Sequence, residues 1–252
     1  MYHYCWLFLF LFMLTGCGGD SGQKKAEPPA IQNPPISTPD PEPESPVLPS
    51  KNESARFLNA ASFGATTNSI NKVSLIGYEA WFDEQFTTTA SSHVAYLSAL
   101  EPTLNLAEDE KLHRGERLEA WFTHAISAPD QLRQRVAFAL SEIFVVSDYS
   151  TFGDDIYGLA NYYDLLVNHA LGNYRDLLEQ ITISPIMGMY LSVLGNEKPN
   201  EDRNIRPDEN FAREVMQLFS IGLVELNLDG SEKLHNGQSI PTYNQDTIKA
   251  FA

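Results

Sequence analysis

The sequence predicts an all-α domain that follows a signal peptide and a proline-rich tether. Three observations support this fold class. After residue 53, apolar residues recur at the three- and four-residue spacing of an amphipathic helix over most of the chain. Glycine and proline stand at the helix ends that this spacing implies, as at Gly64, Gly77 and Pro129. Strand patterns are weak until Val224.

Helices are expected over residues 54–63, 66–77, 78–86, 112–126, 129–143, 162–170, 174–183 and 207–221. A helix start is predicted at Pro129-Asp130, because proline has the φ of a first helical turn and the negative charge of Asp130 is favourable at the positive end of the helix dipole. Its expected buried stripe is Leu132, Val136, Ala139, Leu140 and Ile143. The residues expected to face inward in the 112–126 and 207–221 helices are Leu118, Trp121, Phe122, Ala125, Phe211, Val215, Leu218 and Phe219.

A minor β-hairpin is expected between Val224 and Thr242, near the C-terminus. Asp229-Gly230 and Asn236-Gly237 within it are typical tight-turn dipeptides. A further helix starts near residue 243, and the chain stops after about two turns of it, before any closing cap. We therefore expect one helical domain over residues 53–252, cut short within a longer reading frame.

The N-terminus predicts export and lipidation. The apolar run from Trp6 to Leu14 suits a secretory signal of about 7–15 apolar residues and is too short for a spanning helix of about 20. Leu14-Thr15-Gly16-Cys17 after it resembles the bacterial lipobox, so residues 1–16 are expected to be a signal peptide and Cys17 a lipidated cysteine. By analogy with bacterial lipoproteins, Gly18 rather than Asp after the cysteine is compatible with sorting to the outer membrane. Whether the domain would face the periplasm or the cell surface stays open. Because no Lys or Arg precedes the run, an uncleaved anchor is the alternative.

Residues 17–52 are expected to form a solvated tether behind Cys17. Prolines recur there among Glu, Asp, Ser and Thr, from Pro28-Pro29 to Pro49. Proline removes backbone donors and fixes φ, which excludes a helix or a central strand and favours an extended polyproline conformation. We expect this tether to hold the domain away from a lipid bilayer.

Charge and cysteine content exclude several classes of function. The formal net charge of −16 disfavours nucleic-acid binding, which depends on Lys and Arg. It also disfavours adsorption to anionic lipid, so attachment to the bilayer would come from the acyl group on Cys17. The chain has two cysteines, Cys5 in the signal segment and Cys17. A mature chain without a free thiol excludes a cysteine nucleophile, a zinc–thiolate site and an iron–sulfur cluster.

Long motifs in the domain resemble one bacterial family. The segments are Ala55-Arg-Phe-Leu-Asn-Ala-Ala-Ser-Phe-Gly-Ala-Thr66, Pro129-Asp-Gln-Leu-Arg-Gln-Arg-Val-Ala-Phe-Ala-Leu140, Gly172-Asn-Tyr-Arg-Asp-Leu-Leu178 and Arg206-Pro-Asp-Glu-Asn-Phe-Ala-Arg-Glu-Val-Met-Gln-Leu-Phe219. They are similar to domain-of-unknown-function family 1800. The resemblance covers residues 54–252 and implies an exported, mostly helical protein, often encoded beside an exported sulfatase-like protein. It implies no established activity.

Three groups of residues are candidates for functional sites. Asn196, Asp202 and Asp208 stand in an oxygen-rich segment that could hold Ca²⁺, although their spacing does not follow the EF-hand pattern. Helix capping and an ion pair between Glu209 and Arg213, four residues apart, are the plainer interpretation of that segment, and otherwise no cofactor is expected.

His169 falls on an apolar helix stripe, either as a hydrogen-bonded core residue or as a general base oriented by Asp164 or Asp176. The third candidate is the pair Arg133 and Arg135 with Glu142. Arg135 and Glu142 share a helix face, so an ion-pair network is the plainer interpretation and anion binding by arginine is the alternative. His113, His124 and His235 have no partner at a spacing such as His-Glu-x-x-His, and no role is assigned to them.

Two functions remain open from the sequence. One is a tethered binding or scaffold domain that acts with another exported protein, such as the sulfatase-like protein that the resemblance implies. The alternative is an extracytoplasmic hydrolase or modifying enzyme acting on a polymer such as a glycan, with His169, Glu209 and Arg213 as its catalytic groups. The sequence leaves open whether the chain is an enzyme, because fold and location alone establish no activity.

Overall fold

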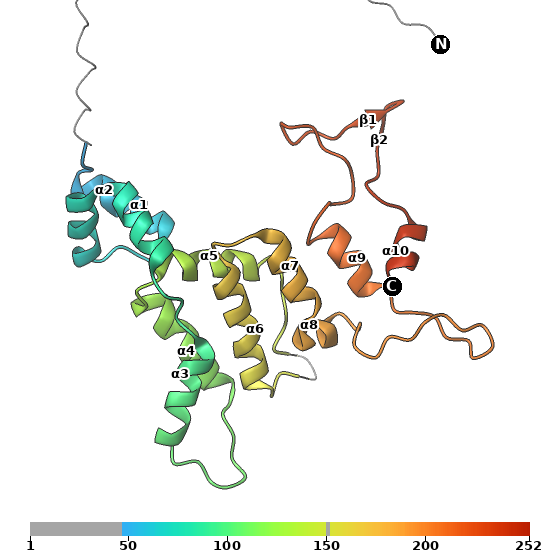
Figure 1. The fold of residues 1–252 in the computed structure, drawn as a ribbon, viewed down its shortest axis with the longest axis horizontal. Coiled ribbons are helices and arrows are strands. Elements are labelled where there is room, and N and C mark those ends of the chain that lie inside the picture. The colour runs from blue at the N-terminus through green and yellow to red at the C-terminus, as the bar shows by residue number, and fades with distance from the viewer. Residues whose placement is uncertain (1–46, 150–151) are drawn as a thin grey trace, which may run out of the picture. The chain divides into compact units, whose positions relative to one another are not determined.

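The computed structural model describes residues 47–149 and 152–252 (Figure 1). The predicted signal peptide, the lipidation site Cys17 and the tether up to residue 46 lie outside the described residues. Within the described ranges, no helix has the length and apolar character needed to span a bilayer.

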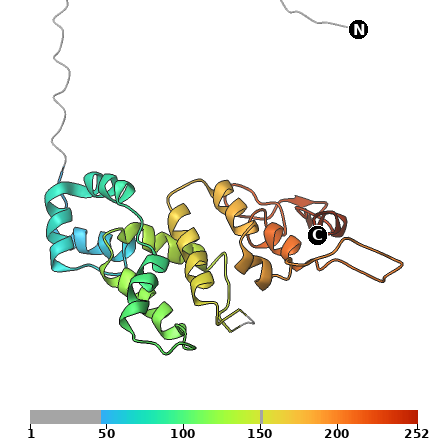
Figure 2. The same cartoon turned by 60° about the horizontal axis from the view of Figure 1, so that its bottom comes forward.

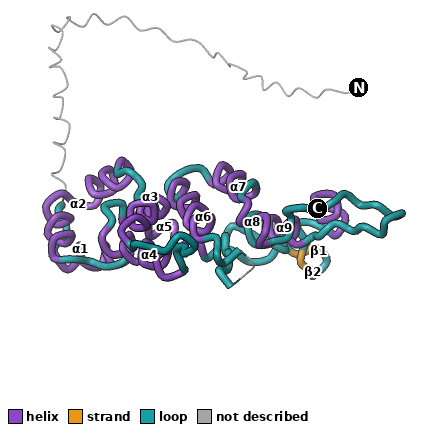
Figure 3. Tube along the Cα trace, turned by 90° about the horizontal axis from the view of Figure 1, so that it is seen from below, coloured by secondary structure: helices purple, strands orange, loops and turns teal. Residues whose placement is uncertain are grey.

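The described part is mostly helical, as the sequence predicts, and strand is confined to one small hairpin (Figure 3). The helices are α1 (Lys51–Ala61), α2 (Thr67–Thr87), α3 (His93–Leu100), the short 3-10 helix η1 (Glu101–Thr103), α4 (Arg114–Ser127), α5 (Gln131–Ser141), α6 (Ile156–His169), α7 (Tyr174–Thr182), α8 (Pro185–Tyr190), α9 (Asn210–Gln217) and α10 (Gln245–Phe251). The strands β1 (Leu234–His235) and β2 (Gln238–Ser239) pair antiparallel, with Leu234 opposite Ser239.

Local capping chemistry sets several helix starts. Ser50 and Glu53 form a reciprocal capping box at the start of α1, with the Ser50 N–H donating to Glu53 Oε2 over 2.8 Å. In α2 the backbone leaves the helical conformation at Gly77, where φ is +80°. Only glycine adopts that φ readily, so α2 consists of two helical segments joined at a kink. The sequence prediction of separate helices on either side of Gly77 is confirmed.

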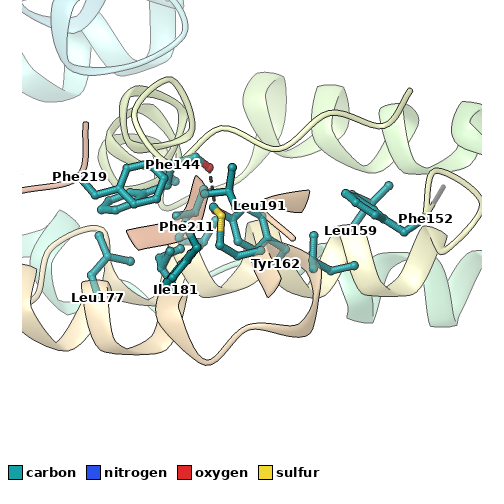
Figure 4. Close-up of a cluster of buried hydrophobic side chains, with 14 residues drawn as sticks. Phe144, Phe152, Leu159, Tyr162, Leu177, Ile181, Leu191, Phe211 and Phe219 are labelled. Carbon is teal, nitrogen blue, oxygen red and sulfur yellow. Dashed lines mark hydrogen bonds between the residues drawn. The ribbon is translucent and has the colours of Figure 1, made fainter. Parts of the chain in front are cut away.

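The larger hydrophobic core lies where α5, α6, α7, α8 and α9 meet (Figure 4). Phe144, just after α5, packs against Phe219, just after α9, with ring centroids 5.0 Å apart. Tyr162 of α6 donates its hydroxyl to the Phe144 carbonyl oxygen over 2.7 Å, the dashed contact in Figure 4. The core thus joins segments that are far apart in the sequence and fixes the middle of α6, from which Tyr163 and Asp164 also project.

The predicted buried stripe of the 129–143 helix is wrong in part. In α5 the buried residues are Gln134 and Ala137, whereas Ala139 and, beyond the helix end, Ile143 are exposed. Helix α5 contacts α1, α2, α4 and α6, so it has no single apolar face to be read from periodicity. Phe122 in α4 and Leu218 after α9 were also expected to face inward and are more than half exposed.

Helices α3 and α8 were not expected from the sequence. Each is short, and Ser92 caps the start of α3 by accepting a hydrogen bond from Ala95 N over 3.0 Å. The hairpin prediction is confirmed, with Asn236-Gly237 as the turn between β1 and β2. Asp229-Gly230 forms the neighbouring turn, next to the bridge between Leu226 and Glu232.

Candidate functional site

Among the described residues, the structure pairs Glu209 with Arg213 but shows no hydrogen bond from His169, the third predicted catalytic residue, to either of them. Glu209 and Arg213 form the expected ion pair along α9, with Arg213 Nη2 3.1 Å from Glu209 Oε2. Glu209 Oε2 also accepts a hydrogen bond from Gln245 Nε2 over 2.7 Å, and Glu209 lines a hollow of about 730 Å³ with Lys249. His169 ends α6 and, within the described chain, has no hydrogen bond to either residue and does not line that hollow.

The predicted metal ligands mainly make backbone contacts. Asn196 Oδ1 accepts the Asp208 N–H over 2.9 Å, and its amide nitrogen donates to the Asp208 carbonyl over 3.0 Å. Asp208 Oδ1 accepts the Asn210 N–H over 2.8 Å at the start of α9, while Asp202 is exposed in the preceding loop. Within the described ranges, no three His, Cys, Asp or Glu residues lie close enough to hold a metal ion.

A buried polar centre lies instead where α3, α4 and α6 meet, and it consists of Ser92, His93, His124, Tyr163 and Asp164. The Asp164 carboxylate accepts four hydrogen bonds, from Ser92 Oγ (2.6 Å), His93 N (2.7 Å), His93 Nδ1 (2.8 Å) and Val94 N (3.1 Å). It therefore satisfies the free backbone donors at the start of α3 from a neighbouring helix. The sequence offered Asp164 as a partner for His169, and that pairing is wrong.

His93 is the central residue of this centre. It is only 2 % exposed, and its Nδ1 faces the Asp164 carboxylate. That contact places the proton on Nδ1 in the neutral ring and leaves the lone pair on Nε2, which is buried without a hydrogen-bond partner. Its ring contacts His124 and Tyr163 edge-on, with centroids 4.7 and 4.8 Å away.

Charge in the centre is controlled by burial and hydrogen bonding. Burial opposes ionisation of Asp164, but the hydrogen bonds from His93, Ser92 and Val94 outweigh it and lower the pKa of Asp164 below its usual value. Burial also lowers the pKa of His124, and the neighbouring His93 adds to the effect. The two shifts favour a carboxylate at Asp164 and a neutral imidazole at His124.

A second buried carboxylate stands next to this centre. Asp130, directly before α5, accepts hydrogen bonds from Ser91 N (2.9 Å), Ser91 Oγ (2.7 Å) and Gln134 Nε2 (3.1 Å). The sequence predicts a favourable interaction of the Asp130 charge with the dipole of α5. The Asp130 side chain makes no capping hydrogen bond to that helix. Asp130 and Asp164 together hold the consecutive serines Ser91 and Ser92 against α5 and α6.

Tyr163 connects the buried centre to an open pocket. The pocket, of about 430 Å³, is bounded by α4, α5, α6 and the segment after α5, and we call it the α4–α5–α6 pocket. Its wall includes Arg117, Trp121, Phe138, Glu142, Asp148 and Tyr163. Burial raises the pKa of Tyr163 to about 12, so its hydroxyl stays protonated. Trp121 and Ser141 lie near that hydroxyl, but neither meets the geometry of a hydrogen bond.

The ion pair predicted between Arg135 and Glu142 is absent from the described chain. Arg135 does not pair with Glu142; its guanidinium lies over the rings of Phe63 and Phe138, 5.6 and 5.5 Å from their centroids. Glu142 is exposed, and its carboxylate forms no hydrogen bond or ion pair within the described chain. Asp148 accepts from both Arg114 and Arg117, which lower its pKa against the opposing effect of burial.

Sequence reasoning missed the His93–Asp164 pair, although one signal was present. Asp164 interrupts an apolar run of α6, between Tyr162-Tyr163 and Leu165-Leu166. A carboxylate in such a run is expected to be buried and paired. Its partner could not be inferred, because His93 lies 71 residues away in a helix that was not predicted.

Comparison with known proteins gives one match. A family model described as "Protein of unknown function (DUF1800)" matches residues 56–252. No curated protein and no solved structure matches the chain.

Proposed function

We propose a function for this chain from one premise: it belongs to the DUF1800 family. The chain is a binding domain of the bacterial cell envelope, anchored through an acyl group on Cys17, that works with another exported protein. The observation that carries this proposal is a set of exposed aliphatic side chains at and around the hairpin between α9 and α10.

We call residues 218–242 the leucine arm. Six of its large aliphatic side chains are more than half exposed: Leu218, Ile221, Leu223, Leu226, Leu228 and Leu234. None belongs to a hydrophobic core cluster of the described chain. In Figure 1 the hairpin extends beyond α9 and α10, and Figure 2 shows it at the same end of the domain from another direction.

The arm holds its shape through its own backbone. Glu225 N donates to the Ile240 carbonyl over 2.8 Å, and Lys233 N donates to the Glu225 carbonyl over 2.8 Å. Isolated bridges of Val224 with Pro241 and of Leu226 with Glu232 tie the arm to itself as well. Each leucine gains up to about 1.5–3 kcal/mol on full burial against a partner. Several exposed leucines in one segment therefore favour an interaction surface.

Charge favours a different protein over a second copy of the chain. Glu225, Asp229 and Glu232 lie among the arm's leucines, and Lys233 is the arm's single Lys or Arg. Two arms meeting face to face would bring these like charges together, which costs energy. The matching partner has an apolar groove with a basic rim. A sulfatase-like exported protein is the candidate that the family resemblance offers.

The hydrolase alternative has weaker support. It requires His169, Glu209 and Arg213 to act on one substrate, and Glu209 and Arg213 are engaged with each other along α9. His169 joins neither of them by a hydrogen bond in the described chain. The binding function needs no such convergence.

The test uses the full acylated chain in detergent micelles, titrated with a purified sulfatase-like protein encoded beside it. We expect the double variant Leu226→Asp/Leu228→Asp to weaken binding at least 100-fold. The matched control is Leu75→Asp/Ile126→Asp, two equally exposed aliphatic residues outside the arm. We expect wild-type affinity for the control and unchanged thermal melting for both variants.

Equal affinity for the arm variant and the control would overturn the proposal. So would sedimentation showing a homodimer that only the arm variant disrupts, because the arm would then be a self-association surface. Absence of binding to the purified protein would remove the sulfatase-like partner from the proposal.

A further inference from the structure

We propose that the α4–α5–α6 pocket binds a neutral saccharide ring. This inference is independent of the leucine arm, because none of the arm's residues lines the pocket. The volume of about 430 Å³ falls in the range of about 300–1,000 Å³ that is typical of small-molecule sites.

Aromatic side chains from three helices form much of the wall. Trp121 comes from α4, Phe138 from α5, and Tyr163 from α6. The Trp121 ring contacts Phe138 with centroids 5.8 Å apart, so neighbouring helices fix its position. Trp121 lies near the Tyr163 hydroxyl, although the two do not meet the geometry of a hydrogen bond. An apolar face with a hydrogen-bond donor at its edge matches a sugar ring, which presents C–H groups on its face and hydroxyls at its rim.

The charges at the pocket favour a neutral ligand. The charged residues of the wall are Arg117, Asp148 and Glu142, and Arg114, which lies outside the wall, shares Asp148 with Arg117, so the four charges sum to zero. Both arginines share Asp148, which leaves Glu142 as the free carboxylate of the wall. An anion would meet Glu142, and a cation would meet the arginines. A sugar hydroxyl can both donate to a carboxylate and accept from an N–H group, so Glu142 and the unpaired Arg117 Nε offer it both kinds of contact.

Unpaired polar atoms in the lining residues give independent support. Arg117 Nε and Tyr163 Oη are buried without a hydrogen-bond partner in the described chain. Buried polar groups are normally paired, so two such atoms in one wall indicate that a polar guest or the water it displaces completes the site. The larger hollow beside Asp109, Glu110 and Asp154, of about 810 Å³, lacks an aromatic wall and offers no comparable fit.

The experiment titrates the full acylated chain in sugar-free detergent with soluble trisaccharides. The neutral probes are chitotriose, cellotriose and maltotriose, and the charged counterparts are trigalacturonic acid and the glucosamine trimer. Trp121 reports binding by its emission, because Trp81, the other tryptophan in the described residues, is 4 % exposed in a different core cluster. We expect at least one neutral trisaccharide to give a saturable change that both charged trimers fail to give.

Variants locate the site, and calorimetry replaces fluorescence for them. We expect Trp121→Phe and Glu142→Gln to weaken binding of the same trisaccharide about tenfold or more. The matched controls are Phe86→Leu, an exposed ring on α2 that does not line the pocket, and Glu179→Gln on the surface of α7. Both controls are expected to bind as the wild type does. Trp121→Phe keeps a large ring in place, so a thermal melt matching the wild type separates lost binding from lost folding.

Three results would overturn the proposal. One is no binding of any neutral trisaccharide at millimolar concentration. Another is tighter binding of a charged trimer than of its neutral counterpart. The third is equal loss of affinity in the pocket variants and in the controls, which would place the binding elsewhere on the chain.

Discussion

Replacing Asp164 with asparagine removes the charge that holds the start of α3 and leaves the shape of the side chain nearly unchanged. The two carboxylate oxygens divide four donors between them: His93 N and Nδ1 on Oδ1, and Ser92 Oγ and Val94 N on Oδ2. An asparagine retains one acceptor oxygen and presents an NH₂ group in place of the other. The favoured orientation turns the NH₂ toward Ser92, because the serine hydroxyl can rotate and accept.

The expected cost follows from the donors that remain. The Val94 N–H is fixed by the backbone, so it would face the NH₂ group of the asparagine and lose its acceptor. Leaving a buried donor unsatisfied costs about 1–3 kcal/mol. The contacts from Ser92 and His93 change from charge-assisted to neutral hydrogen bonds, which adds about 1–2 kcal/mol. We therefore expect Asp164→Asn to lower the free energy of unfolding by about 2–5 kcal/mol, a large share of the about 5–15 kcal/mol typical of a domain.

Urea denaturation followed by circular dichroism at pH 7.5 measures this difference. The matched control is Asp176→Asn, an exposed carboxylate in the first turn of α7, with an expected cost below about 1 kcal/mol. A loss below about 0.5 kcal/mol for Asp164→Asn, or equal losses for the two variants, would refute the assignment of Asp164 as the residue that fixes α3.

Two further predictions concern acid stability and lipidation. The folded state lowers the pKa of His124 from 6.5, so below about pH 6.5 the unfolded chain binds a proton that the folded chain does not, and stability falls as pH falls. His124→Gln should therefore flatten the decline in urea midpoint between pH 6.5 and 5, and parallel declines would contradict this. Metabolic labelling with an alkyne fatty acid should mark the wild-type chain and leave Cys17→Ala unmarked, whereas equal labelling of both would refute lipidation at Cys17.

The helices and the hairpin could be predicted because their signals are local. The kink at Gly77 and the turn at Asn236-Gly237 each depend on a residue that tolerates a positive φ, and such residues are visible in the sequence. The ion pair of Glu209 with Arg213 is local as well, since the two residues lie four apart on one helix.

The candidate sites could not be predicted because they depend on contacts between distant segments. The His93–Asp164 pair joins a helix too short to be recognised with the middle of another. Apolar periodicity also failed to predict the buried face of α5, because helices pack against α5 on several sides. Gln134 is buried among them although it is polar, since its side chain donates a hydrogen bond to Asp130. Arg135 has its aromatic partners on α5 itself and before α2, so the expected pairing with Glu142 did not form.

The attachment of Ser91 and Ser92 to Asp130 and Asp164 bears on the order in which the chain can assemble. These contacts span 39 and 72 residues, and both acceptors lie C-terminal to the serines that they hold. A chain that emerges from its N-terminus can form α1 and α2 early, but the connection to α3 has no anchor until α6 has followed. Early assembly is therefore confined to the α1–α2 pair, which packs together through Leu58, Val73 and Trp81, and the segment from Ser91 through α3 joins the fold only after α6 has been made.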